Sequence, residues 1–235
     1  MDTISSRNPA SLGGNPTPAG HKVRERRVTE SNEIKRVVVS RLPTRYGLFD
    51  IYGYQARSGG LEPEAMDQVA LVFGQLPLPS PTLVRIHSEC LTGEVFGSLR
   101  CDCQAQLELG LETIVANGSG VVVYMRGHEG RGIGLINKLR AYALQDQGAN
   151  TVEANLDLGL PVDAREYSAA IAILRDLGIA ELRLMTNNPE KVRAVEQGGL
   201  VVAERVPLVT LSTADNSDYI RTKQDELGHL FEPRA

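Results

Sequence analysis

LELGLETIVANGSGVVVYMR, residues 107–126, decides the fold class because it joins two kinds of periodicity. From Leu107 onward, apolar residues recur at i, i+4, i+7 and i+8, which predicts an amphipathic helix that ends near Gly118. Residues 120–126 then form an apolar run of strand length, which is typical of a buried strand. The sequence therefore predicts a helix that leads directly into a core strand.

Outward from this stretch, toward the N-terminus, the pattern favours strands. Residues 34–89 contain short β-branched or aromatic runs that are separated by Pro, Gly and Ser. The runs are residues 37–39, 47–52, 69–73 and 83–86. This arrangement predicts an antiparallel meander or a small barrel.

Toward the C-terminus, helices and strands alternate. A helical stripe begins at Leu135 and is closed by Gly148, and a third helix stops at Gly178. Asn188 and Pro189 have the residue types of a helix N-cap and a first helical position. The remaining predicted elements are strands at residues 181–186 and 200–205 and a last helix at residues 216–227. The sequence thus predicts an α+β protein, with a β-rich N-terminal half and an alternating strand–helix C-terminal half.

The composition is that of a globular protein. The 235 residues are 42% hydrophobic and 23% charged, and the net charge of −4 gives no electrostatic case for binding nucleic acid or a membrane surface. No apolar run approaches the roughly 20 residues that span a bilayer, and no secretory signal is visible, so we expect a soluble, cytoplasmic protein. Residues 1–32 are rich in Ser, Asn, Pro and Gly and predict a flexible extension, which leaves 33–232 as one folded domain.

The chain contains three cysteines, Cys90, Cys101 and Cys103. Their odd number, without a secretion signal, argues against a disulfide framework. Thiolates are soft ligands that select zinc, and a set of three leaves the fourth position to water, as in catalytic sites. The spacing therefore indicates an open zinc site. Two alternatives stay open: His87 or Asp102 completes a closed structural site, or the cysteines are simply buried.

Longer motifs carry a resemblance to a known family. They are RIHSECLTG at 85–93, SLRCDC at 98–103, EGRGIGL at 129–135, NKLRAY at 137–142, TVEAN at 151–155, TNNP at 186–189 and GHL at 228–230. In this order they resemble the motifs of GTP cyclohydrolase II, and they cover essentially everything outside the N-terminal extension. The resemblance implies a hydrolase that converts GTP to 2,5-diamino-6-(5-phospho-D-ribosylamino)pyrimidin-4(3H)-one, formate and pyrophosphate. That reaction is the first committed step of riboflavin biosynthesis or a related pathway.

By this resemblance, Cys90, Cys101 and Cys103 hold a catalytic zinc ion. C8 of guanine is a weak electrophile, and free water at neutral pH is almost never hydroxide. Zinc lowers the pKa of bound water from about 15.7 to about 7, so a hydroxide that can attack C8 is available at neutral pH. The resemblance thus gives the cysteine cluster a chemical purpose.

The resemblance also implies a GTP site. Its residues are Arg85, Ile86, His87, Ser88, Glu89, Gln106, Glu129, Gly130, Arg131, Thr151, Thr186 and Lys191. Carboxylate and amide groups can pair with the N1–H and N2–H₂ edge of guanine, whereas Arg and Lys suit the triphosphate. The triphosphate should also bring Mg²⁺, which binds phosphates with few protein ligands.

Three further residues match family positions with catalytic roles. Tyr142 would lie near the reacting base, where a phenol can orient water or relay a proton, although its helical stripe also fits a core residue. Asp163 and Arg165 match the family's proton acceptor and its proposed arginine nucleophile toward the α-phosphorus. Because a guanidinium stays protonated, an electrostatic role for Arg165 is equally consistent, and residues 163–166 alone read as a charged helix start.

Other expectations concern the assembly and competing functions. The resemblance implies a homodimer, and we expect His128 to be an exposed loop histidine or a phosphate donor. The residues before the matched region are too few for a domain that makes 3,4-dihydroxy-2-butanone 4-phosphate, so one activity is expected. Two other functions compete with the main one: ring opening that stops at the formylamino compound, and nucleotide binding with a structural zinc and no turnover.

Overall fold

The computed structural model describes residues 34–56, 66–225 and 227–230. The predicted extension, residues 1–32, lies outside the described residues, so the division at 32 and 33 stays a prediction. In the described part of the chain, no helix combines the length and the apolar character that a membrane crossing requires.

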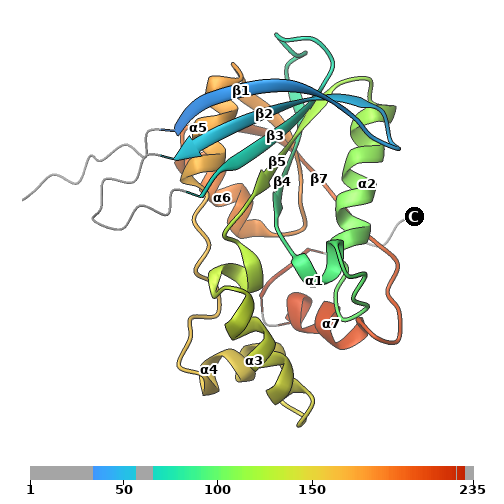
Figure 1. Cartoon of the computed structure of the whole chain (residues 1–235), viewed down its shortest axis with the longest axis vertical. Coiled ribbons are helices and arrows are strands. Elements are labelled where there is room, and N and C mark those ends of the chain that lie inside the picture. The colour runs from blue at the N-terminus through green and yellow to red at the C-terminus, as the bar shows by residue number, and fades with distance from the viewer. Residues whose placement is uncertain (1–33, 57–65, 226, 231–235) are drawn as a thin grey trace, which may run out of the picture. The chain divides into compact units, whose positions relative to one another are not determined.

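The described strands form one seven-stranded mixed sheet (Figure 1). The strands are β1 (Ile34–Pro43), β2 (Leu48–Ala56), β3 (Gln68–Phe73), β4 (Thr82–Ser88), β5 (Gly120–Met125), β6 (Glu181–Met185) and β7 (Val201–Val206). Their order is β1-β2-β3-β5-β4-β6-β7. The first three strands are an antiparallel meander, β5 pairs antiparallel with β3, and β5, β4, β6 and β7 are parallel. Of the two forms expected for the N-terminal half, the chain adopts the meander.

The described helices follow the predicted alternation. They are α1 (Leu91–Glu94), α2 (Cys103–Ala116), the 3-10 turn η1 (Glu129–Gly132), α3 (Leu135–Gln145), α4 (Thr151–Asp157), α5 (Ser168–Asp176), α6 (Pro189–Gln197) and α7 (Ser217–Asp225). The Asn188 side chain accepts from the amide of Glu190 with Pro189 at the first position, so that predicted cap is confirmed. The charged helix start considered for residues 163–166 is wrong, since α5 begins at Ser168. The helices α1 and α4 and the turn η1 were not predicted from the sequence patterns.

Helices cover both faces of the sheet (Figure 1). Val121 and Val123 of β5 point to a core cluster that includes side chains of α5 and α6, whereas Val122 points to a cluster with α2. All three valines are 0% exposed, because side chains alternate between the faces of a strand and both faces are covered. The predicted buried strand is therefore confirmed. Burial of each such side chain stabilises the fold by roughly 1.5–3 kcal/mol.

The topology brings distant motifs to one edge of the sheet. β4 lies between β5 and β6, and all three strands are parallel, so their carboxyl ends meet at the same edge. The chain leaves β4 at Ser88, leaves β5 at Met125 and leaves β6 at Met185. One family-like motif spans the end of β4, and others follow β5 and β6. The carboxyl ends of parallel strands are the usual place for a ligand site in open α/β sheets.

Candidate active site

A cavity of about 710 Å³ lies at this edge of the sheet. Its wall contains most of the site residues predicted from the sequence. These are Arg85, His87, Ser88, Glu89, Cys90, Cys101, Cys103, Gln106, Glu129, Gly130, Arg131, Tyr142, Thr151, Arg165, Thr186 and Lys191. Residues from seven separate stretches of the chain therefore converge on one space, which is large enough for a nucleotide-sized ligand.

Two predicted site residues lie elsewhere. The side chain of Ile86 is 0% exposed in the hydrophobic core, and only its carbonyl oxygen reaches toward the site, where it accepts from Lys191 Nζ at 2.8 Å. Asp163 lines an adjoining cavity of about 400 Å³ rather than the larger one. Arg165 lines both cavities, so it connects Asp163 to the main site.

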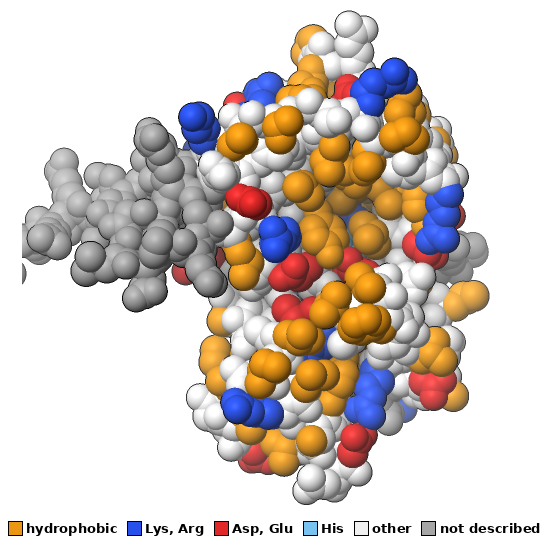
Figure 2. Space-filling model, viewed as in Figure 1, with side chains coloured by type: hydrophobic (Ala, Val, Ile, Leu, Met, Phe, Trp, Pro, Cys, Tyr) orange, Lys and Arg blue, Asp and Glu red, His pale blue; other side chains and the backbone are white. Residues whose placement is uncertain are grey.

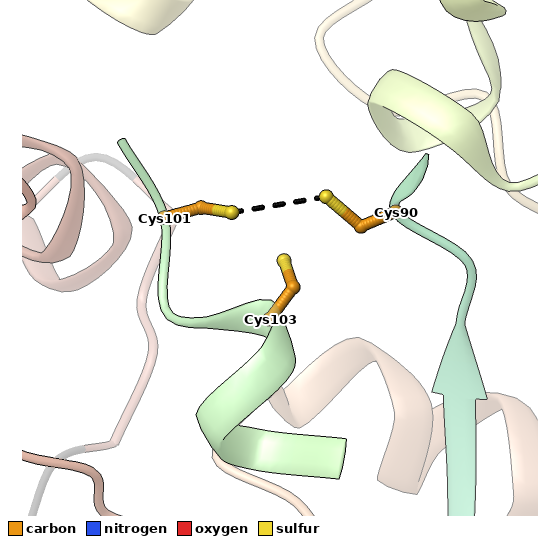
Figure 3. A group of neighbouring side chains, drawn as sticks. All are labelled: Cys90, Cys101 and Cys103. Carbon is orange, nitrogen blue, oxygen red and sulfur yellow. Dashed lines mark hydrogen bonds between the residues drawn. The ribbon is translucent and has the colours of Figure 1, made fainter. Parts of the chain in front are cut away.

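The three cysteine thiols converge (Figure 3). Their Sγ atoms all lie within 4.8 Å of one another, and Cys90 Sγ is 3.7 Å from Cys101 Sγ. Two sulfurs on a tetrahedral zinc ion, each at about 2.3 Å from the metal, are about 3.8 Å apart. The observed sulfur–sulfur distance therefore fits a shared ion. The loop between β4 and α2 provides this geometry because it brings Cys90 back against the start of α2.

The alternative of a closed four-ligand site does not match the geometry. Among the described residues, no histidine or carboxylate joins the three thiols in one metal-sized group. His87 Nε2 instead bonds Glu94 Oε1 at 2.8 Å. Asp102 accepts hydrogen bonds from Gln106 Nε2 at 2.6 Å and from Lys223 Nζ at 2.5 Å. Both candidates for a fourth ligand are thus held by other partners.

Lys138 adds a positive charge to the cysteine cluster. Its Nζ donates to Cys90 Sγ at 3.1 Å, to Thr92 Oγ1 at 2.8 Å and to Glu129 Oε1 at 2.5 Å. Hydrogen bonds from Cys101 and Cys103, with the nearby ammonium of Lys138, lower the pKa of Cys90 and favour its thiolate. Burial lowers the pKa of Lys138, but the Cys90 charge and the Glu129 hydrogen bond outweigh it, so that pKa is raised. The ammonium thus stabilises sulfur in the form that binds metal.

Gly93 is packed directly beneath the thiols. A Cβ atom at this position would lie 2.8 Å from Cys101 Sγ and 3.2 Å from Cys90 Sγ. We expect Gly93→Ala to push the sulfurs apart and to weaken zinc affinity by about 10–100-fold, the range for residues that support metal ligands. A competition titration with a chromogenic chelator measures this change.

The same substitution should leave the metal-free fold intact. Gly93 has no positive φ and lies within the short helix α1, where alanine is the better helix former. Melting curves of the metal-free variant and metal-free wild type should therefore nearly coincide. Wild-type zinc affinity in Gly93→Ala would contradict the assignment of the thiols as ligands.

A buried polar network lies behind the cavity wall. Arg85 Nε donates to His87 Nδ1 at 3.1 Å, so His87 Nε2 carries the proton and donates to Glu94. Tyr124 Oη donates to the other Glu94 oxygen at 2.6 Å. Burial, with the charges of Arg85 and Lys191, lowers the pKa of His87, and burial raises the pKa of Glu94 to about 7. The network fixes the ring of His87 in one tautomer.

This network continues into the guanidinium of Arg85. Its Nη2 donates to Gln106 Oε1 at 3.0 Å, and Gln106 in turn donates to Asp102. Burial lowers the pKa of Arg85 to about 10, which still leaves it charged at neutral pH. The positions of two predicted GTP ligands, Arg85 and Gln106, are therefore set by one chain of hydrogen bonds.

The loop after β5 presents its backbone to the cavity. Gly130 has φ +59° and Arg131 has φ +65°, and Arg131 is the one non-glycine residue with positive φ in the described part of the chain. A non-glycine residue held in this backbone conformation lowers the stability of the fold by about 1–3 kcal/mol. Such residues cluster at functional sites. The Arg131 carbonyl accepts from the Ala164 amide at 2.9 Å, which holds the strained turn.

Two nitrogens of the Arg131 guanidinium lack hydrogen-bond acceptors among the described residues. They are Nη1 and Nη2, and both are buried. A buried cationic group without partners is costly, because the lost hydration is not replaced. A phosphate in the cavity would supply the missing acceptors.

Arg165 is held by the carboxylate that precedes it. Its Nε donates to Asp163 Oδ1 at 2.9 Å, and its Nη2 forms a second, short bond to Asp163 Oδ2. Its Nη1 donates to Ser88 Oγ at 3.4 Å. Burial lowers the pKa of Arg165, but the hydrogen bond to Asp163 outweighs it and raises the pKa above the ordinary arginine value. The side chain is therefore a fixed cation at the cavity wall.

His128 is not the exposed loop histidine expected from the sequence. It is 7% exposed; its Nε2 donates to the Glu166 carbonyl at 3.0 Å, and its Nδ1 lies 3.1 Å from Ser88 Oγ. The ring packs edge-on against Tyr167. Burial, with the charges of Arg165 and Lys191, lowers the pKa of His128 to about 4. Its neutral Nδ1 therefore accepts from the Ser88 hydroxyl, whose oxygen accepts from Arg165.

The pKa of His128 makes stability depend on pH. The unfolded chain binds a proton at this residue below pH 6.5, whereas the folded chain does so only near pH 4. The contribution to stability is thus present above pH 6.5 and is lost as pH falls toward 4, by up to about 3 kcal/mol. We expect His128→Gln to lose stability less steeply over that range. Urea midpoints of both proteins at several pH values measure it, and parallel profiles would refute it.

Tyr142 faces the cavity rather than the core. It is half-buried, its ring lies beneath the guanidinium of Arg100 at 4.8 Å, and its hydroxyl is 3.4 Å from Thr92 Oγ1. Thr92 also binds Lys138, so the phenol is linked to the group beside Cys90. Burial raises the pKa of Tyr142, so the phenol keeps its proton at neutral pH.

Exposed apolar side chains are found in the segment that precedes Cys101. Leu99 lines the cavity and is 62% exposed, and Val95 and Phe96, a few residues earlier in the chain, are 68% and 72% exposed. Figure 2 shows hydrophobic side chains gathered in the middle of one face of the molecule. An exposed apolar side chain on the cavity wall, such as Leu99, can contact the flat ring of a bound base.

Several residues of the cavity wall were not predicted from the sequence patterns. They are Lys138, Asn155, Asp215, Tyr219, Thr222, Lys223 and His229. Lys138 and His229 stand inside the family-like motifs NKLRAY and GHL, which was the available signal. Tyr219 and Lys223 come from α7 and had no such signal.

Converging thiols beside a wall of buried cations define a class of protein whose cavity could hold a metal ion next to an anionic ligand. Residues 35–207 match the family described as GTP cyclohydrolase II. This chain belongs to the GTP cyclohydrolase II family.

Curated relatives agree with this assignment. The chain is 53% identical over 206 residues to the riboflavin biosynthesis protein RibBA of Salinispora tropica, covering 88% of this chain and 50% of that protein. It is 52% identical over 198 residues to the monofunctional riboflavin biosynthesis protein RIBA 3, chloroplastic, of Arabidopsis thaliana, covering 84% of this chain and 38% of that protein. The RibBA protein of Aquifex aeolicus is 50% identical over 205 residues, with coverage of 87% and 49%. The chain spans about half or less of the length of these relatives.

Proposed function

We propose that this chain is a zinc-dependent GTP cyclohydrolase II. It converts GTP to 2,5-diamino-6-(5-phospho-D-ribosylamino)pyrimidin-4(3H)-one, with release of formate and pyrophosphate, as the first step of riboflavin biosynthesis or a related pathway. The observation that carries the proposal is the group of three thiols within 4.8 Å on the wall of a cation-rich cavity. Family membership supports the substrate class.

Cys90, Cys101 and Cys103 would hold the zinc ion. A zinc ion with an open position supplies a water molecule that is activated near neutral pH. Lys138 keeps Cys90 in the thiolate form, and Gly93 leaves room for the sulfurs to approach. The protein thus provides charge and space, and the metal provides the activated water.

The two ends of GTP call for different chemistry, and the cavity wall offers both. Carboxylate and amide groups such as Glu89 and Gln106 suit the guanine edge, and the cations of Arg131, Arg165 and Lys191 suit the triphosphate. Burial, with the charges of Arg165 and Arg85, lowers the pKa of Lys191. A bound polyphosphate would reverse that repulsion and favour the charged ammonium.

Tyr142 and Arg165 are the side chains for the two chemical steps. The protonated phenol of Tyr142, next to the thiols, can hold or relay a proton during ring opening. Arg165 is fixed by Asp163 and can stabilise the charge that develops on the α-phosphate. Because its pKa is raised, we infer an electrostatic role for Arg165 rather than attack by its neutral form.

Three further properties belong to the proposal. Mg²⁺ would accompany the triphosphate, since the wall supplies few carboxylates of its own. A homodimer is consistent with the edge strand β1, where Val37, Val38 and Val39 are about half exposed. A cytoplasmic location remains a prediction.

The experiment is product analysis of zinc-loaded protein with GTP and Mg²⁺. We expect one formate and one pyrophosphate for each GTP consumed, with metal content measured alongside. Accumulation of a formylamino pyrimidine would favour the enzyme that stops after ring opening. No product at all from protein that binds GTP would favour the nucleotide-binding module.

A further inference from the structure

The C-terminal segment, residues 216–225 and 227–230, lies beyond the part of the chain that matches the family model, which ends at residue 207. It is nevertheless attached to the site at two points. Lys223 Nζ bonds Asp102 Oδ1 at 2.5 Å, and both side chains are almost fully buried. The Leu230 amide donates to the Asn187 carbonyl at 2.9 Å. The segment is therefore held against both the cysteine loop and the end of β6.

These attachments place four residues of the segment on the cavity wall: Tyr219, Thr222, Lys223 and His229. The Tyr219 ring lies 4.4 Å from Lys223 Nζ and 6.0 Å from the guanidinium carbon of Arg131. One aromatic ring thus lies near a cation of the segment and near the Arg131 guanidinium, whose Nη1 and Nη2 have no hydrogen-bond partner among the described residues. The segment therefore packs beside Arg131, whose buried nitrogens would gain acceptors from a bound anion.

His229 stands where the two cavities adjoin. It lines the cavity of about 710 Å³ and also the one of about 400 Å³, as does Arg165. Its own amide donates to the Lys223 carbonyl at 3.0 Å, which turns the chain back toward the site. A ligand group that Arg165 binds is therefore close to His229 as well.

The charge around His229 is strongly positive. Burial, together with the cations of Lys223, Arg131, Arg165 and Lys191, lowers the pKa of His229 to about 3. The imidazole is therefore neutral at pH 7 and has one N–H donor. A neutral donor amid cations adds a hydrogen bond to a phosphate without adding repulsion among the protein's own charges.

We propose that the C-terminal segment forms one wall of the polyphosphate site and that His229 donates a hydrogen bond to a phosphate oxygen of the nucleotide. Lys223 acts as a positioning residue, since its ammonium is committed to Asp102. The inference rests on the proposed function for the identity of the nucleotide, but the recognition of a polyphosphate rests on the wall itself. It gives a role to the motif GHL at 228–230, which the catalytic assignment left unused.

The test measures binding of inorganic tripolyphosphate and of GTP to the zinc-loaded full chain by calorimetry. Loss of a hydrogen bond to a charged group should raise both dissociation constants about tenfold or more in His229→Ala. His229→Gln keeps an N–H donor and should recover most of the affinity. The matched control is Leu230→Ala, which changes the neighbouring, 47% exposed side chain and keeps the backbone bond to Asn187; it should bind like wild type.

Three outcomes would overturn the inference: unchanged binding in His229→Ala, no recovery in His229→Gln, or an equal loss in Leu230→Ala, which would indicate docking of the segment alone. Formate release by the wild type is measured in parallel. Tripolyphosphate binding that depends on His229 in a protein that makes no formate would refute the proposed function and leave this inference standing. Formate production by the wild type, with unaltered tripolyphosphate binding in His229→Ala, would support the proposed function and refute this inference.

Discussion

Cys101→Ser should lose its zinc and all formate production. Cys101 Sγ lies 3.7 Å from Cys90 Sγ, and a serine hydroxyl is a shorter and harder ligand that does not replace a soft thiolate. With two thiols left, the ion lacks the ligand set of a stable site. We expect less than about one tenth of the wild-type zinc content after dialysis, and a turnover rate reduced by at least about 10³-fold, because bound water near pKa 7 is lost. Elemental analysis and a formate assay measure the two effects.

The matched control for this variant is Gln104→Ala. Gln104 is exposed, follows Cys103 in the first turn of α2 and does not line the cavity. Gln104→Ala should keep both zinc and activity. That result would show that a substitution in the first turn of α2 is not by itself enough to cause the losses expected in Cys101→Ser. Formate release by zinc-free Cys101→Ser at the wild-type rate would remove the metal from the mechanism.

The local patterns of the sequence were enough for most of the fold. The helix and buried strand of residues 107–126 were predicted because periodicity is a property of neighbouring residues. The helix α4 was missed although a signal was present: Asn150 and Glu153 form a complete capping box at its start. Residues 163–166 have charges typical of a helix start, but Asp163 pairs with Arg165 instead, and the helix begins at Ser168.

The site was only partly predictable, because its contacts join distant residues. The cysteines stand close in sequence, so their spacing alone indicated a shared ion. Lys138 is 48 residues from Cys90, and Lys223 is 121 residues from Asp102. Lys138 stands inside the motif NKLRAY, but no local pattern indicates its contact with Cys90 or distinguishes Lys223 from a solvated lysine. The burial of His128 likewise depends on Tyr167 and Ser88, which the fold brings to it from other segments.

Arg165→Lys should slow pyrophosphate release far more than it weakens GTP binding. Arginine at this position holds Asp163 with two hydrogen bonds and still directs Nη1 toward Ser88 and the cavity. A lysine ammonium keeps the charge but cannot make the paired bonds, so its position is not fixed. Loss of one well-placed donor to transition-state charge costs about 10²–10³ in kcat. The other cations of the wall remain, so we expect the KM for GTP to change only a few-fold.

The measurement is the rate of pyrophosphate release beside the rate of formate release, at saturating GTP. Arg183→Lys is the matched control, because Arg183 bonds Glu204 at 2.7 Å on β7, does not line the cavity and should tolerate the same replacement. An unchanged pyrophosphate rate in Arg165→Lys would exclude Arg165 from the reaction. A large rise in KM with an unchanged kcat would make it a binding residue, since uniform binding affects KM and not the chemical step. A selective loss of kcat would support the electrostatic role, because a guanidinium with a raised pKa can stabilise charge without giving up its proton.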